Sequence, residues 1–163
     1  MLRSLSAGFA GALALNAVHE AAHRLTPAEA ARRMPRLDRL GTWALARALG
    51  LGIRPGREAD DAGSVYVAAL ALDTAVNTLG YALVGDGTGR PVLRGLALGL
   101  SGGALAVAGA RALGRSQDVA RAPATPAVTV AWYVVGGAVA GLTARALARR
   151  AAAESSESDQ EAA

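Results

Sequence analysis

Residues 123–144 contain no charged side chain, and this run of 22 constrains the fold more than any other feature of the sequence. At about 1.5 Å per residue, a helix of that length crosses the roughly 30 Å hydrocarbon core of a lipid bilayer. The run contains no internal turn signal, so its length favours a helix over a strand. The sequence therefore predicts a membrane-spanning helix over 123–144.

Two further apolar stretches, 64–84 and 91–110, have about the same length. Arg94 lies near the end of the second stretch, where its long side chain can reach the lipid headgroups. The first stretch carries Asp73 almost at its centre, which costs about 3 kcal/mol on insertion scales. Each Leu or Val favours insertion by only about 0.3 to 0.6 kcal/mol. The segment is therefore predicted to insert marginally, with Asp73 facing protein or water.

The N-terminal stretch supplies a fourth predicted helix, over about 4–25. Only 16 residues between Arg3 and Glu20 are uncharged, and they make about 24 Å of helix. To cross a bilayer, this helix must draw His19 and Glu20 into the membrane edge. A cleaved signal peptide is the alternative, because one Arg precedes an apolar core that small residues follow. We favour retention of the helix.

The composition agrees with helices that pack closely in lipid. The 163 residues are 52% apolar and include 20 Gly and no Cys, which excludes a disulfide scaffold and a disordered chain. Glycines recur every fourth residue in two of the predicted helices, a spacing that lets helix backbones approach. These ridges predict tight helix packing and offer a surface for a homo-oligomer: Gly95, Gly99 and Gly103, and Gly137 and Gly141.

All 17 basic residues are Arg, and they flank the apolar runs. The chain therefore lacks the basic cluster of a nucleic-acid-binding protein, despite its net charge of +4, and we expect no nucleic-acid partner. Eleven Arg lie in or beside the connections 26–63 and 111–122, against six on the opposite side. The positive-inside rule puts these two connections in the cytoplasm and both termini outside. We expect a multi-pass protein of the bacterial inner membrane, with the lipid bilayer as its partner.

The connection 26–63 carries helix signals of its own. Residues 26–29 form a capping box with Pro27 at the first helical position. Apolar residues then recur at helical spacing over 37–51, with Arg nearby, which predicts a short helix lying in the interface. A loop helix packed on the bundle is the alternative. The predicted fold class is all-α: a four-transmembrane-helix bundle, residues 1–150, with this short interfacial helix between helices 1 and 2.

The C-terminal residues 151–163 form an acidic tail. They contain Ser, Glu, Asp and Ala and no large apolar side chain. Such a segment cannot bury enough apolar surface to offset its ordering entropy. The sequence therefore predicts a disordered tail.

One motif carries chemistry, the His-Glu-Ala-Ala-His sequence at 19–23. On a helix, His19 and His23 lie one turn apart, the spacing at which two imidazoles hold one Zn²⁺. Glu20 would then act as general base beside the metal-bound water. Asp73 is predicted at a similar depth and is the candidate third ligand.

This motif resembles the site-2 protease family, whose members carry His-Glu-x-x-His in a membrane helix and an Asp ligand on a later helix. The resemblance implies an intramembrane zinc-dependent hydrolase with His19, His23 and Asp73 as ligands and Glu20 as catalytic base. It departs from that family at Thr74, because the family has Gly after the Asp.

The same residues support a structural interpretation, which we prefer. Asn16, Glu20 and His23 share one helical face, so hydrogen bonds to a second helix would satisfy them. We call the predicted contact of polar side chains between helices 1 and 2 the polar seam. Its other members are His19, Asp73, Asn77 and Tyr81. A third hypothesis is a proton-coupled carrier of small solutes, because small multidrug transporters also have four helices with a carboxylate in the first.

A broader resemblance covers most of the chain. It rests on a short apolar helix that ends in His-Glu, on Pro-Arg-Leu-Asp-Arg-Leu-Gly at 35–41, and on Thr-Pro-Ala at 125–127 followed by Trp132 and Tyr133. These features resemble small, functionally uncharacterised bacterial multi-pass membrane proteins. The resemblance implies a location and a helical fold, and no activity.

Overall fold

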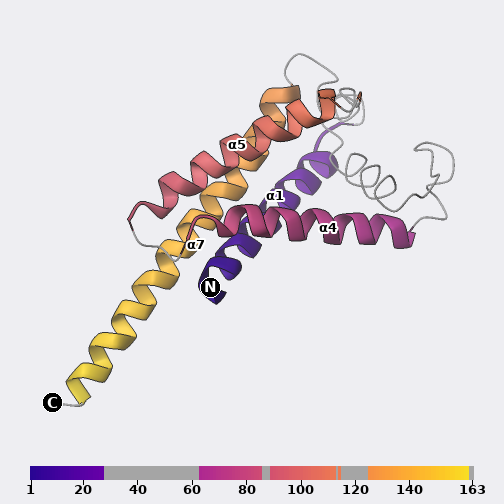
Figure 1. Ribbon diagram of the computed structural model, residues 1–163. Helices are drawn as coiled ribbons and strands as arrows, with labels where there is room; N and C mark the ends of the chain where they lie inside the picture. The colour runs from indigo at the N-terminus through magenta and orange to yellow at the C-terminus, as the bar shows by residue number, and fades with distance from the viewer. Residues whose placement is uncertain (28–62, 86–88, 113, 115–124, 162–163) are drawn as a thin grey trace.

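The computed structural model describes residues 1–27, 63–85, 89–112, 114 and 125–161. Within these ranges every regular element is a helix (Figure 1), so the predicted all-α class is confirmed there. The helices are α1 (Leu2–Leu25), α4 (Gly63–Ala82), α5 (Pro91–Ala112) and α7 (Thr125–Glu161). The predicted interfacial helix lies outside the described residues, as does most of both Arg-rich connections.

The four predicted helices correspond to the four observed helices, and their boundaries agree within about two residues except at the end of α7. There the structure corrects the sequence analysis, because α7 continues through the expected disordered tail to Glu161. Ala, Arg, Glu and Gln are good helix formers, and extending an existing helix avoids the unfavourable nucleation step. Side-chain hydrogen bonds such as Ser155 Oγ to the Ala151 carbonyl (2.9 Å) accompany this exposed extension.

The helices pack with α7 at the centre. α5 lies along one side of α7 and α1 along another, while α4 packs mainly on α1 (Figure 1). Each of these contacts is antiparallel. Along α5, for example, Gly95 meets Gly137 whereas Gly103 meets Val130. The N-terminal part of α4 extends beyond the other helices, and Val67 is exposed there (Figure 1).

Glycine decides how closely α5 and α7 approach. A Cβ atom built on Gly95 would overlap the backbone of Gly137, and one built on Gly137 would overlap the backbone of Gly95. Further along, a Cβ on Gly103 would lie 2.7 Å from the Cα of Val130. The predicted glycine ridges therefore face each other within one chain, and this contact occupies the surface expected to bind a second copy.

Large apolar side chains lie mostly on the outside of the structure. The buried core consists largely of small residues such as Ala7, Ala12 and Ala140, with Leu15 and Trp132 among its few large members. Exposed large apolar residues occur on all four helices: Phe9 and Leu13; Val67, Leu70, Leu72, Val76 and Leu79; Leu93, Leu96, Leu100 and Leu105; Val135 and Leu142. A water-soluble bundle has the opposite arrangement, because it buries its largest apolar side chains.

Two of the four helices, α5 and α7, are long and apolar enough to cross a membrane. Only 22% of the most apolar part of α5 is buried in the structure, and 39% of that of α7. The core helix of a soluble protein would be mostly buried, so neither helix has that character. The structure thus supports a membrane location at the level of these two helices.

The turn between α4 and α5 uses two glycines with positive φ, Gly85 at 85° and Gly89 at 77°. Other residues seldom adopt this conformation, because their Cβ atom collides with the backbone. The guanidinium of Arg94 lies over this turn, 3.5 Å from where a Cβ of Gly85 would be. Arg94 therefore reaches back past the start of α5, in the direction that the sequence analysis expected.

Candidate functional site

The polar contact between α1 and α4 is a short chain of hydrogen bonds. Asn16 Nδ2 of α1 donates to Thr74 Oγ1 of α4 at 3.0 Å. Thr74 Oγ1 in turn donates to the Leu70 carbonyl at 2.8 Å. The Asn16 amide is thus joined through one hydroxyl to the backbone of the neighbouring helix.

The sequence analysis missed Thr74. It placed Asp73, Asn77 and Tyr81 on one helical face and treated Thr74 only as a departure from a protease motif. A residue next to Asp73 points about 100° away from it around the helix. The signal available in the sequence was the ability of a Thr hydroxyl to bond its own helix at i−4 and still accept a hydrogen bond from another.

Asp73 is half-buried on α4. The Asn77 side chain, one turn later on the same helix, interacts with its carboxyl group. This contact joins two residues of the predicted polar seam without crossing between helices.

Tyr81 turns toward α7 instead of α1. Its side chain is only 3% exposed, and its hydroxyl donates to the Tyr133 carbonyl at 2.7 Å. The ring fits there because Gly11 and Gly136 leave space, and a Cβ on Gly136 would lie 2.6 Å from the Tyr81 hydroxyl. Tyr81 thus joins the end of α4 to the N-terminal third of α7, whereas the sequence analysis placed it in the seam with α1.

His19 and His23 form an aromatic cluster with Trp132 of α7. The two imidazole centroids are 4.7 Å apart with an interplanar angle of 77°, and the His19 and Trp132 centroids are 5.0 Å apart at 75°. Such edge-to-face arrangements are favourable for aromatic rings. Trp132 is 6% exposed and belongs to the main buried cluster. The histidine pair therefore packs the C-terminal part of α1 against α7.

Glu20 lies on a more exposed face. Its side chain is 52% exposed and accepts a hydrogen bond from Arg24 Nε at 2.6 Å, an ion pair between residues four apart. The pair is local to α1, and its two members lie one turn apart. In this arrangement the Glu20 carboxylate is engaged by Arg24.

The zinc hypothesis needs His19, His23 and Asp73 to converge around one ion. Within the part of the chain that the structure describes, no three His, Cys, Asp or Glu side chains gather closely enough to hold a metal ion. The structure brings the two histidines together and leaves Asp73 apart from them. Among the described residues, this geometry provides no third protein ligand beside His19 and His23.

Comparisons with known proteins add no family to this picture. No family model matches the chain, and neither a curated protein nor a solved structure matches it. The function therefore has to be argued from the geometry of the described residues. That geometry consists of side-chain contacts that join α1 to α4, α4 to α7 and α1 to α7.

Proposed function

We propose that this chain is a four-pass integral membrane protein of the bacterial inner membrane, whose polar residues act by holding its helices together. The observation that carries the proposal is the exposure of large apolar side chains on all four helices around a core of small residues. In lipid, apolar side chains are well solvated, and helices associate through close packing and polar contacts instead. This protein has both kinds of contact.

The apolar exterior is the first support for four spans. α5 and α7 have the length and composition of membrane helices. α1 and α4 also direct large apolar residues outward, among them Phe9, Leu13 and Val76. In water, large apolar side chains exposed on all four helices would be an aggregation hazard.

The antiparallel order of the helices is the second support. α1 is antiparallel to α4 and to α7, and α5 is antiparallel to α7. A chain that crosses a bilayer four times has to reverse direction at each crossing. The observed directions satisfy that requirement.

The polar residues of α1 and α4 are the third support, because membrane helices must satisfy their polar groups internally. Asn16 and Thr74 satisfy each other across the contact, and Asn77 accompanies Asp73. These contacts reduce the cost that Asp73 and its neighbours impose on insertion of α4. Among the described residues no specific contact favours the hydrolase or the carrier, so we propose the structural role for these polar side chains.

Accessibility of single cysteines tests the four-pass arrangement directly, because the natural chain has none. Four variants mark the helix ends: Ser4→Cys, Thr26→Cys, Ala112→Cys and Ser156→Cys. We expect a membrane-impermeant maleimide to label positions 4 and 156 in intact spheroplasts, and positions 26 and 112 only after permeabilisation. If only α5 and α7 cross, position 26 will be labelled together with position 4, which would overturn the proposal.

A further inference from the structure

A groove of about 690 Å³ lies between the start of α5 and the C-terminal half of α7. This volume is within the range of about 300 to 1,000 Å³ that is typical of ligand sites. Pro91, Leu93 and Leu96 give the groove apolar surface from α5. Three of the described residues that line it are basic and none is acidic: Arg90, Arg145 and Arg149.

The helix packing explains why the groove is open. Gly141 lets α7 approach the first turn of α5, and a Cβ at this glycine would lie 2.6 Å from the Cα of Val92. Immediately beyond that contact α5 begins at Pro91, whereas α7 continues to Glu161. This part of α7 therefore has no residue of α5 opposite it. Arg145 and Arg149 lie one turn apart on this part of α7, on the same face.

The three Arg side chains lie where both helices leave their apolar segments. The uncharged run 123–144 ends directly before Arg145, and Arg90 directly precedes the apolar residues of α5. Arg at such positions places its apolar stem along the helix and its guanidinium at the level of the headgroups. This step rests on the proposed function, because a headgroup level exists only if α5 and α7 cross a bilayer.

No carboxylate neutralises this basic cluster among the described residues, where the ion pair that is found joins Glu20 to Arg24. The first turn of α5 also contains no acidic residue, so the positive end of its helix dipole adds to the field. Guanidinium groups bind phosphate oxygens in a bidentate manner. The groove thus combines phosphate-binding groups with an apolar wall for a hydrocarbon chain.

We propose that this groove binds an anionic phospholipid. Arg90, Arg145 and Arg149 contact its phosphate, and one acyl chain lies along Leu93 and Leu96. The lining described offers no acidic partner for the ammonium of a zwitterionic headgroup, which is why the site selects an anionic lipid.

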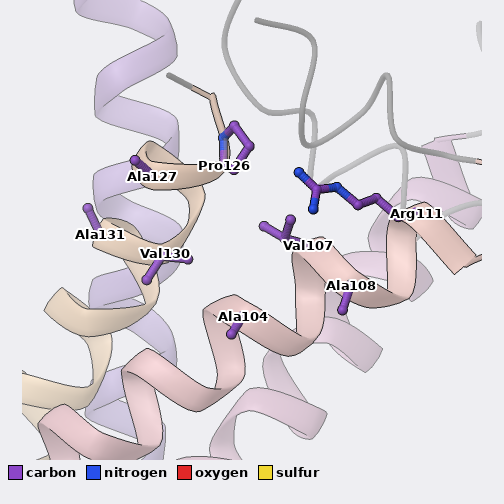
Figure 2. A pocket seen from close by; sticks show the side chains of 8 residues that line it. All are labelled: Ala104, Val107, Ala108, Arg111, Pro126, Ala127, Val130 and Ala131. Atoms are coloured by element: carbon purple, nitrogen blue, oxygen red, sulfur yellow. The ribbon is translucent and has the colours of Figure 1, made fainter. Parts of the chain in front are cut away.

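A second groove between the same two helices provides a natural contrast. It lies at the opposite end, has a volume of about 600 Å³, and is lined by Ala, Val and Pro side chains (Figure 2). Arg111 is the one charged residue among its eight lining residues. The two grooves are similar in size, but this one is lined by one Arg instead of three. Arg111 is therefore the matched control for a headgroup site.

The test is lipid binding to the full chain in mild detergent, measured by native mass spectrometry. The probes are phosphatidylglycerol, phosphatidylethanolamine and inorganic phosphate. We expect phosphatidylglycerol to bind more tightly than phosphatidylethanolamine, and each of Arg90→Ala, Arg145→Ala and Arg149→Ala to weaken it about fivefold, the effect of roughly one interfacial charge. Arg145→Lys should lose less binding than Arg145→Ala, because it keeps the charge and loses only the bidentate geometry.

Arg150→Ala and Arg111→Ala are the controls, since neither residue lines the basic groove. Equal binding of both lipids, or an equal loss in Arg150→Ala, would overturn the inference. So would displacement of phosphatidylglycerol by millimolar inorganic phosphate, because the site would then be one for free phosphate. Carbonate-washed membranes separate the two proposals: a chain released by the wash contradicts the membrane proposal, whereas a retained chain without lipid preference contradicts the groove alone.

Discussion

The α5–α7 and α1–α4 contacts hold two helices together by different means. Between α5 and α7 the contact is backbone against backbone, with Gly95 and Gly137 each in place of a side chain that would collide. Between α1 and α4 one glycine contact, Gly8 against the Thr78 carbonyl, is supplemented by the hydrogen bond from Asn16 to Thr74. These are the two sources of helix association that remain where lipid removes the hydrophobic driving force.

The two contacts differ in what they tolerate. A glycine contact depends on the absence of atoms, so any added Cβ must separate the backbones along the whole interface. A hydrogen bond depends on two side chains that can be replaced one at a time, and its value in a membrane averages about 0.6 kcal/mol. The glycine positions should therefore respond to substitution more strongly than the Asn16–Thr74 hydrogen bond.

The largest effect is expected for Gly95→Ala. The new methyl group would overlap the Gly137 backbone, which cannot move as a flexible side chain would. We expect this substitution to lower the free energy of unfolding by about 2 kcal/mol or more. The measurement is reversible unfolding in mixed micelles, followed by circular dichroism.

Gly109→Ala is the matched control, because it lies on the same helix and a Cβ there meets nothing within 4 Å. Alanine should stabilise the helix at this position by up to about 1 kcal/mol. Equal stability of the two variants would show that the close approach of α5 and α7 does not exist in the membrane protein.

A smaller effect is expected at the α1–α4 contact. A double-mutant cycle with Asn16→Ala and Thr74→Val should give a coupling free energy of about 0.6 kcal/mol and at most about 1.7 kcal/mol. The same unfolding measurement applies. A coupling free energy of zero would show that the Asn16–Thr74 hydrogen bond does not contribute to the α1–α4 contact.

The smallest effect is expected for the exposed pair on α1. Glu20→Gln should cost about 0.3 kcal/mol at low salt and less at high salt, because the pair with Arg24 is local and largely exposed. A loss of several kcal/mol would contradict the local, exposed character of the pair. The loss of one bound zinc per chain, measured by metal analysis, would contradict the purely structural role and support the hydrolase hypothesis.

The agreement between sequence and structure is best where one local property decides the outcome. A predominantly apolar run of about 20 residues indicates a helix wherever it packs, so the four predicted helices match the observed ones closely except at the end of α7. The ridge through Gly95, Gly99 and Gly103 was also predicted from the sequence, since its spacing of four residues places the glycines on one face. The end of α7 departed from prediction because disorder was inferred from missing apolar residues, although propagation of an existing helix needs few of them.

The candidate site was predicted less well, because its members depend on which helices become neighbours. The seven polar residues of the seam are present, but Asn16 bonds Thr74, Tyr81 bonds the α7 backbone, and Asp73 remains with Asn77 on its own helix. The two histidines were expected opposite α4 and instead pack on Trp132. A helical wheel gives the direction of a side chain and does not give the helix that it meets.

The sequence by itself determined that the chain is helical, where its helices lie, and which of their faces carry glycine, because these properties depend on residues within one or two turns. Only the tertiary structure decided that the glycine ridges face each other, that the histidine pair lies apart from Asp73, and that three Arg from two helices line one groove. Such pairings depend on the relative positions of helices that are far apart in the chain. They follow from the balance of close packing and polar satisfaction over the whole bundle.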